Sequence, residues 1–189
     1  MNTFFYNNLK MEIPEGVYYP REDSILFADF LNEINVGGKK VLEIGCGSGF
    51  LSIICAKKGA KVTSVDIDEN SVKTTLKNAE LNKVSLNSFC SDVFKNVKGK
   101  FDIIIFNSPY LPKDNYEKDI KESIQWSNEK ALKLFLSDFK NYLNKKGFAL
   151  LLISSITNID EIELNKFKYN IVSRKKIDWE ELKILKLEP

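Results

Sequence analysis

Blocks of hydrophobic residues recur along the chain, and their spacing switches between the helical period and short continuous runs. Apolar residues recur at helical spacing in five segments, and we predict a helix over each: 23–34, 48–58, 70–81, 128–143 and 159–167. Short apolar runs predict five buried strands, over 41–44, 61–66, 85–90, 101–106 and 147–153. Strand and helix therefore alternate from residue 40 to residue 167, which indicates a parallel sheet with helical crossovers.

The last part of the chain has a different pattern. Residues 169–177 and 181–187 alternate apolar and polar positions, so we predict an antiparallel pair of strands at the end of the sheet. The predicted fold class is α/β, a doubly wound and mostly parallel seven-stranded sheet. We expect one domain over residues 1–189, with an N-terminal segment and helix over 1–39 and the sheet core over 40–189.

Composition narrows the possible functions. The chain has 28 basic and 26 acidic residues, a formal charge of +2, which argues against strong nucleic-acid binding through bulk charge. It has no histidine, which removes Ser-His-Asp catalysis and histidine-ligated metals, and we expect no metal site. Cys46, Cys55 and Cys90 fit no disulfide framework and indicate free thiols in a reducing compartment. The longest apolar run, 148–153, is far short of the roughly 20 residues of a membrane span; without a secretory signal, a soluble cytoplasmic protein is expected.

The strongest local signal is VLEIGCGSGF over residues 41–50, where a strand runs into three glycines and a helix follows. Gly45, Gly47 and Gly49 allow tight turns and a close approach of the backbone to a ligand. Their spacing differs from the dinucleotide fingerprint G-x-G-x-x-G. Glu43 would repel a pyrophosphate but suits a ligand with an ammonium group. S-adenosylmethionine carries such a group and no phosphate.

Carboxylates follow the next two strands. Asp66 ends the second strand and can accept both hydroxyls of a ribose, with Ile67 beside it. Asp92 follows the third strand, where it can accept the exocyclic amine of adenine while Val93 supplies an apolar wall. Each aspartate alone would be taken for a solvated loop acid or a helix cap. Acids at consecutive strand ends, on the ligand-binding edge of such sheets, favour a binding site.

The fourth strand ends in Asn107, Ser108, Pro109 and Tyr110 at the same edge. The Asn107 amide oxygen and the Ser108 carbonyl are two acceptors that suit a planar NH2 group. Pro109 biases Ser108 toward an extended conformation and so helps to fix its carbonyl, and Tyr110 would wall the reacting centre. These four residues are the candidate catalytic set. An Asn-x-Pro-Tyr turn by itself is weak evidence for a catalytic site. It becomes stronger evidence in a chain that also has a glycine loop and acids at the ends of the preceding strands.

These motifs together resemble the class I S-adenosylmethionine-dependent methyltransferases that methylate nitrogen, which have a Rossmann-like sheet. The segment VYYPREDSI over residues 17–25 resembles Y-x-P-x-E-D-[ST] of the archaeal and eukaryotic HemK-type enzymes, which methylate the glutamine of a release-factor Gly-Gly-Gln motif. Trp126 and residues 180–186 are also placed as in that group. The resemblance covers roughly residues 13–187.

The resemblance implies roles for single residues. It places Ser24, Glu43, Gly45, Asp66, Asp92 and Val93 at the cofactor, with Cys46, Gly47, Gly49 and Ile67 in the same loops and Asn107 touching both cofactor and acceptor. Ser108 stands where the family has its first proline. The hydrogen-bond acceptor at this position is the backbone carbonyl, which serine also has, so methyl transfer can still take place. Without the proline we expect a less rigid loop.

Several alternatives stay open from the sequence. The same arrangement serves methylation of a protein lysine, an adenine or a guanine, and Ser108 is compatible with a catalytically silent cofactor-binding subunit. A nicotinamide oxidoreductase is disfavoured by the glycine spacing and by Glu43. The expected partner is a peptide-chain release factor. Related enzymes also use a small zinc-binding activator subunit that extends the sheet, and residues 84–89, the expected edge strand, alternate in a way that suits either such a partner or a covering helix.

Overall fold

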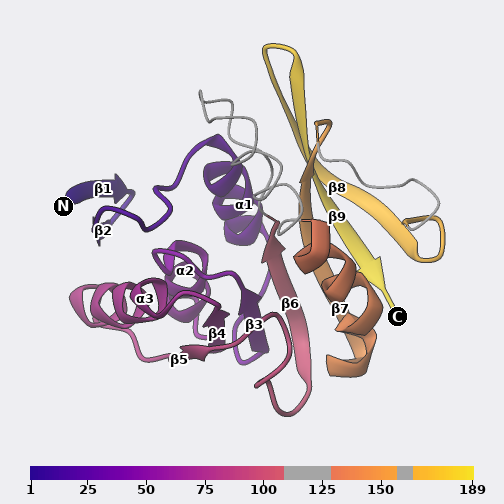
Figure 1. The fold of residues 1–189 in the computed structure, drawn as a ribbon, viewed down its shortest axis with the longest axis horizontal. Helices are drawn as coiled ribbons and strands as arrows, with labels where there is room; N and C mark the ends of the chain where they lie inside the picture. The colour runs from indigo at the N-terminus through magenta and orange to yellow at the C-terminus, as the bar shows by residue number, and fades with distance from the viewer. Residues whose placement is uncertain (109–128, 157–163) are drawn as a thin grey trace.

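The computed structural model describes residues 1–108, 129–156 and 164–189, and these form a central sheet with helices on both faces (Figure 1). The sheet has seven strands in the order β5-β4-β3-β6-β7-β9-β8. In chain order they are β3 (Lys40–Ile44), β4 (Lys61–Asp66), β5 (Asn87–Cys90), β6 (Phe101–Asn107), β7 (Leu143–Ser154), β8 (Lys168–Ile177) and β9 (Glu180–Glu188). The five strands β5, β4, β3, β6 and β7 run parallel to one another. Strand β9 lies between β7 and β8 and is antiparallel to both. The predicted fold class is confirmed.

Two hydrophobic cores form on the two faces of the sheet. Helices α1 (Glu22–Glu33), α2 (Phe50–Lys57) and α3 (Glu69–Leu81) contribute to one core, which contains Phe27, Leu31, Ile53, Ile105 and Leu152. The other core contains helical residues 129–138 and the 3₁₀ helix η1 (Phe139–Tyr142), with Phe135, Phe139, Ile104 and Leu151 buried together. Successive residues of β6 and β7 point to opposite cores, as expected for strands covered on both faces.

Some predicted boundaries were wrong. The helix predicted over 128–143 is helical over described residues 129–138, tightens into η1, and gives way to strand at Leu143. Leu143 pairs with Phe101, and the β6–β7 register then shifts before Ile103 pairs with Phe148. At Gly147, inside this irregular stretch, an added Cβ would lie 2.9 Å from the Phe101 carbonyl oxygen. The helix predicted over 159–167 lies mainly outside the described residues.

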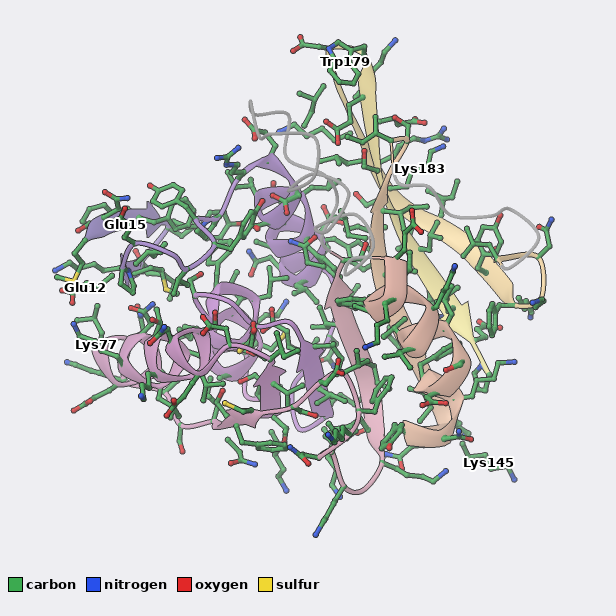
Figure 2. All side chains as sticks on the ribbon, in the orientation of Figure 1. Glu12, Glu15, Lys77, Lys145, Trp179 and Lys183 are labelled. Atoms are coloured by element: carbon green, nitrogen blue, oxygen red, sulfur yellow. The ribbon has the colours of Figure 1, made fainter. Side chains whose placement is uncertain are left out.

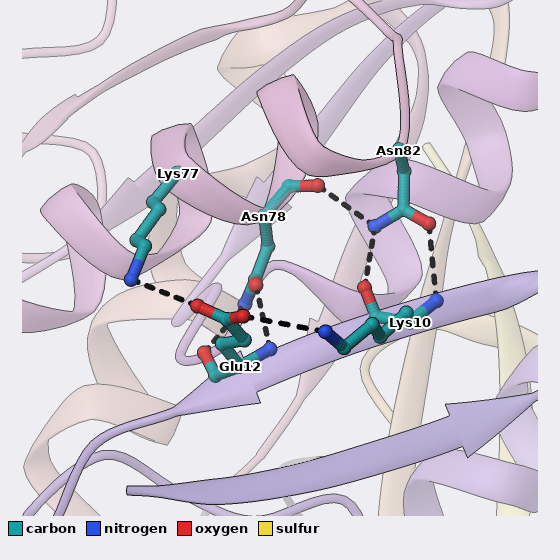
Figure 3. A network of polar contacts seen from close by, with 5 residues as sticks. All are labelled: Lys10, Glu12, Lys77, Asn78 and Asn82. Carbon is teal, nitrogen blue, oxygen red and sulfur yellow. Dashed lines mark hydrogen bonds and ion pairs between the residues drawn. The ribbon is translucent and has the colours of Figure 1, made fainter.

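An N-terminal hairpin, which we did not predict, packs beside α3. It consists of β1 (Asn2–Tyr6) and β2 (Leu9–Ile13), paired antiparallel. Asn82 Nδ2 donates to the Lys10 carbonyl at 2.8 Å, and Lys10 N–H donates to Asn82 Oδ1 at 3.2 Å. Asn78 makes the same two-way contact with the backbone of Glu12, at 3.1 and 2.8 Å (Figure 3). One side chain of α3 and one from its C-cap residue therefore bind β2 as a neighbouring strand would.

Asn78 also connects the hairpin to the loop after β3. Asn78 Nδ2 also donates to the Ser48 carbonyl at 3.0 Å, and Asn78 has no exposed surface. At the rim of this contact, Lys77 Nζ lies 2.9 Å from Glu12 Oε2 (Figure 2). The position of the glycine loop is therefore coupled to that of the hairpin through one buried side chain.

The arrangement of strands brings the motif residues to one edge of the sheet. The strands β3, β4, β5 and β6 are parallel, so the segments that follow them all leave at the same edge. Strand β5 forms one side of the sheet, as predicted for residues 84–89, although it begins only at Asn87. Over the described part of the chain, no helix combines the length and the apolar character needed to cross a membrane.

Candidate active site

The glycine loop between β3 and α2 is closed by its own hydrogen bonds. The N–H groups of Gly45 and Cys46 donate to the Val65 carbonyl at 2.8 and 3.0 Å, and Gly49 N–H donates to the Cys46 carbonyl at 2.7 Å. Phosphate-binding loops use free backbone N–H groups. Since these three donors are already used inside the protein, the loop is a poor match for a phosphate and leaves its ligand mainly acceptors.

The loop needs glycine for both its conformation and its packing. Gly45, Gly47 and Gly49 have φ values of 69°, 51° and 81°, in the left-handed region. A Cβ on Gly49 would lie 2.8 Å from the Thr75 side chain and 3.0 Å from its Cα. The Thr75 hydroxyl lies 3.3 Å from Cys46 Sγ and 3.2 Å from the Gly47 carbonyl oxygen. Because Gly49 is left-handed, α2 begins at Phe50 rather than at residue 48 as predicted.

Glu43 lies on β3 beneath the loop and has only 3% of its surface exposed. The Ser52 hydroxyl of α2 donates to its carboxylate. Burial raises the pKa of the Glu43 carboxyl to about 8; the negative charge of Asp66 adds to this, and the hydrogen bonds from Ser52 oppose it. A cation bound nearby would stabilise the carboxylate and lower this pKa again.

Asp66 connects the glycine loop to the end of β4. Gly47 N–H donates to Asp66 Oδ2 at 2.9 Å, and Asp68 N–H donates to Asp66 Oδ1 at 3.0 Å. Burial raises the pKa of the Asp66 carboxyl, and these backbone hydrogen bonds oppose the rise. Each carboxylate oxygen can accept more than one hydrogen bond, so both remain capable of binding a hydroxyl. Ile67 follows with 73% of its surface exposed, an apolar side chain at the mouth of the loop.

The turn after β5 is ordered by Ser91. Its N–H donates to the Asp66 carbonyl at 2.8 Å, which places the turn beside the end of β4. Its hydroxyl donates to the Val93 carbonyl and accepts from Asn96 N–H, both at 3.0 Å. Val93 is buried and has a φ of 48°, which is rare for a β-branched residue, and Asp92 beside it is half-buried. The two residues predicted to flank an adenine therefore sit in a turn with a strained backbone.

Asn107 ends β6 with its amide held from one side only. Nδ2 donates to Asp23 Oδ2 of α1 at 2.7 Å and to Ser24 Oγ at 3.4 Å. Oδ1 is buried and has no hydrogen-bond partner among the described residues. A buried acceptor without a partner is costly, by about 1–3 kcal/mol, so it marks a place where a ligand donor belongs. Asn107, which was predicted to hold the group that is methylated, thus has an amide oxygen free to accept a hydrogen bond from that group.

Ser108 is better fixed than the sequence suggested. Its side chain is buried, and its hydroxyl donates to the Leu152 carbonyl of β7 at 2.7 Å. We expected serine in place of proline to loosen the loop, but this hydrogen bond anchors the residue to the sheet. Pro109 and Tyr110, the other two candidate catalytic residues, lie outside the described residues, as does Trp126.

Two residues of this site, Asp23 and Tyr18, were not predicted from the sequence. Asp23, in the first turn of α1, is 2% exposed and accepts hydrogen bonds from Asn107 Nδ2 and from Tyr18 Oη, at 2.7 and 2.9 Å. The Tyr18 Cβ lies 3.7 Å from where a Cβ on Gly47 would be. The only sequence signal for either residue was its place inside the segment 17–25.

The described residues contain no group of three or more Cys, Asp or Glu side chains that could hold a metal ion. All three cysteines are free, with Cys46 and Cys55 buried and Cys90 exposed. Burial raises the pKa of the Cys46 thiol to about 12, so it is not a thiolate at neutral pH.

The groups at this edge of the sheet fit one kind of ligand. A buried carboxyl group (Glu43), a carboxylate that faces the loop (Asp66) and a loop whose N–H groups are largely used favour a ligand with a cation and hydroxyls and without phosphate. The side chains of Ile67, which is exposed, and of Val93, which is buried, are apolar and suit a flat ring. These features suit S-adenosylmethionine, and the fold and the site define a methyltransferase that uses it.

The chain belongs to the methyltransferase small domain family, whose model matches residues 22–168. It is 42% identical over 188 residues to the "Putative protein N5-glutamine methyltransferase" of Methanocaldococcus jannaschii, covering 94% of both chains. It is 34% identical to a release factor glutamine methyltransferase of Fusobacterium nucleatum over 68% of this chain and 38% of that one. It is also 34% identical to a ribosomal protein L11 methyltransferase of Campylobacter lari, over 71% and 48%.

The fold has solved counterparts. The structure of the Thermus thermophilus 16S rRNA N2 G1207 methyltransferase, in complex with AdoMet and guanosine, matches with a TM-score of 0.73 at 23% identity. The match covers 99% of this chain and 49% of that one. This likeness establishes the Rossmann-like methyltransferase fold.

Proposed function

We propose that this methyltransferase modifies the side-chain amide of a glutamine, and that its substrate is the Gly-Gly-Gln motif of a peptide-chain release factor. The observation that carries this proposal is the buried Asn107 Oδ1 without a hydrogen-bond partner among the described residues, an acceptor that suits an NH2 group. The relative that covers 94% of both chains is named for N5-glutamine methylation, and a second relative is named for release factors.

We assign the cofactor site to the loops around β3, β4 and β5. The Glu43 carboxylate would attract the ammonium group of the cofactor, and Asp66 would accept the ribose hydroxyls. Asp92, Ile67 and Val93 would surround the adenine. The other residues proposed to line this site are Ser24, Gly45, Cys46, Gly47, Gly49 and Asn107. S-adenosylmethionine supplies an electrophilic methyl group from its sulfonium centre.

The residues of the acceptor site would act by positioning and electrostatics. The nitrogen of an amide is a poor nucleophile because its lone pair is delocalised into the carbonyl. Asn107 Oδ1 and the Ser108 carbonyl would each accept one N–H of the substrate NH2 group, which fixes the plane of the amide and favours positive charge developing on nitrogen. The hydrogen bond from Ser108 Oγ to β7 holds that carbonyl in place. The proton can leave to solvent after transfer, and no general base is assigned.

The test of the substrate is a labelling experiment. The purified protein is incubated with labelled S-adenosylmethionine and a release factor, either intact or with the Gly-Gly-Gln glutamine replaced by alanine, and the modified residue is mapped by mass spectrometry. We expect label on the intact protein only. Equal labelling of both would dismiss the glutamine, and a label mapped to a lysine would establish the competing substrate class.

The test of the site is Asn107→Ala. Loss of an oriented transition-state contact of this kind lowers the rate by on the order of 10²–10³. Calorimetry should show that S-adenosylmethionine still binds, because Asn107 is proposed to contact mainly the acceptor amide and the other residues of the cofactor site are unchanged. Asn144→Ala is the matched control, since Asn144 donates to Asp102 Oδ1 at 2.7 Å at the opposite end of β6. A variant Asn107→Ala with undiminished transfer would remove Asn107 from the mechanism.

A further inference from the structure

Three segments meet in a chain of hydrogen bonds around the buried Asp23 carboxylate at the end of β6. Tyr18 Oη, from the segment before α1, donates to Asp23 Oδ1 at 2.9 Å. Asn107 Nδ2, from β6, donates to Asp23 Oδ2 at 2.7 Å and to Ser24 Oγ at 3.4 Å. Asp23 is 2% exposed and Ser24 is 5% exposed. Each oxygen of this buried carboxylate therefore accepts a hydrogen bond from a different segment of the chain.

The carboxylate determines which way round the Asn107 amide lies. The two ends of an amide have nearly the same shape, so packing alone does not distinguish them. An ionised carboxylate only accepts hydrogen bonds, and the end of Asn107 that faces Asp23 must therefore be the NH2 group. The oxygen is left on the other side, buried and without a partner among the described residues.

We propose that Asp23 is a positioning residue that locks the Asn107 amide with Oδ1 toward the acceptor nitrogen. The inference rests on the proposed function, in which Asn107 holds the acceptor. In the flipped orientation the NH2 group of Asn107 would face the NH2 group of the substrate, and neither could accept. A fixed negative charge behind Asn107 also favours positive charge developing on the acceptor nitrogen in the transition state.

A favourable interaction with the dipole of α1 does not by itself explain the burial and the hydrogen bonds of Asp23. Acids in the first turn of a helix stabilise it through the dipole and do so while exposed to solvent. Glu22, the other acid in that turn, is exposed, as such a role allows. Asp23 instead is buried and uses both oxygens on side chains, one of them 84 residues away in the sequence.

The decisive experiment exchanges the two partners. Asn107→Asp places two carboxylates within hydrogen-bond distance, where both cannot be ionised, and should lower kcat by about 100-fold or more. The double variant Asp23→Asn with Asn107→Asp restores one donor and one acceptor at the contact and again leaves an oxygen facing the substrate. We expect it to recover at least about tenfold of the lost kcat. A double variant that is folded and as inactive as Asn107→Asp overturns the proposal.

Single variants separate positioning from stability. Asp23→Leu removes the acceptor and should lower kcat by about 100-fold while the KM for S-adenosylmethionine changes by less than about threefold. Glu22→Gln is the matched control in the same turn and should leave kcat unchanged. An unchanged kcat in folded Asp23→Leu contradicts the proposal.

A measurement without turnover keeps this inference separate from the proposed substrate. The side-chain ¹⁵N–¹H signals of Asn107 are identified by their absence in Asn107→Asp, and their hydrogen exchange is compared between wild type and Asp23→Leu. We expect exchange at least about tenfold faster in Asp23→Leu. If wild type does not methylate the release factor but this difference is present, the substrate assignment fails and the positioning role stands. Equal exchange rates overturn the positioning role whatever the substrate.

Discussion

Glu43 is a carboxyl group held where its charge is unfavourable, and this makes the stability of the protein depend on pH. Burial raises its pKa from 4.5 to about 8. Between these values the folded state keeps a proton that the unfolded state has lost, so the stabilising contribution is complete below about pH 4.5 and disappears as the pH rises through about 8.

Glu43→Gln should therefore raise the melting temperature at pH 9 and change it little at pH 5. Glutamine keeps an acceptor for the Ser52 hydroxyl and removes the buried charge, worth a few kcal/mol, as an order of magnitude, at high pH. Thermal unfolding at both values without cofactor checks this. Parallel pH profiles for the two proteins would show that Glu43 is not the titrating group.

Asp66 and Asp68 are two residues apart and should respond oppositely to substitution. Asp66→Ala should weaken S-adenosylmethionine binding by tenfold or more, since hydrogen bonds to a charged group contribute about 1.5–3 kcal/mol each. Asp68 instead caps α3 by accepting from the N–H groups of Asn70 and Ser71, both at 3.1 Å. Asp68→Ala should cost about 1 kcal/mol of stability and leave the affinity nearly unchanged. Calorimetry measures the affinity and urea unfolding the stability of both variants. A loss of affinity in Asp68→Ala without one in Asp66→Ala would contradict these assignments.

Residues at the ends of predicted strands were within reach of sequence analysis, and their partners were not. Asn107 and Asp66 follow apolar runs, so a parallel sheet must bring them to one edge. Asp23 belongs to a helix that could lie in many places, and nothing local indicates a partner in β6. The hydroxyl of Ser108 presents the same difficulty, because its acceptor on β7 becomes visible only once the strands are in register.

Among the elements, the N-terminal hairpin depends on Asn78 of α3 and on Asn82, the residue that caps the C-terminus of that helix. Asn78→Ala or Asn82→Ala leaves partly buried backbone groups of β2 without their partners, at a cost of about 1 kcal/mol for each hydrogen bond lost. We expect faster hydrogen exchange at Lys10 and Glu12 in both variants. Lys77→Ala is the control, because it removes only the exposed ion pair with Glu12 and should leave this exchange nearly unchanged.

The same hairpin shows why some elements escape prediction. Residues 2–6 mix polar and aromatic residues without a clear period, and the alternation over residues 9–13 is only five residues long, which is a weak signal. The outer edge of β2 is completed by the side chains of Asn78 and Asn82 rather than by another strand. At Leu143 the difficulty was the reverse. An apolar residue there continues the helical stripe of the preceding turns and also fits a strand opposite Phe101, and the pairing with Phe101 decides.

For the whole molecule, one core extends from the hairpin to the last strand. Met11 of β2 is fully buried in the same cluster as Phe50 of α2 and Ile184 of β9. Met11→Ala should cost about 2–5 kcal/mol. Because the core is continuous, we expect the hairpin amides and the sheet amides of each protein to lose protection at one common denaturant concentration, which is lower in Met11→Ala than in wild type. Separate transitions would show that the hairpin unfolds on its own.

The position of β9 has a consequence for how the chain is made. It lies between β7 and β8 and pairs with both, from Ala149 to Ser154 on one side and from Lys168 to Ile177 on the other. During synthesis β7 and β8 emerge first, and each presents an open edge until residues 180–188 leave the ribosome. The interior of the sheet is thus completed by the strand that is translated after the other strands of the sheet. A nascent chain held short of residue 188 keeps unpaired, aggregation-prone strand edges exposed.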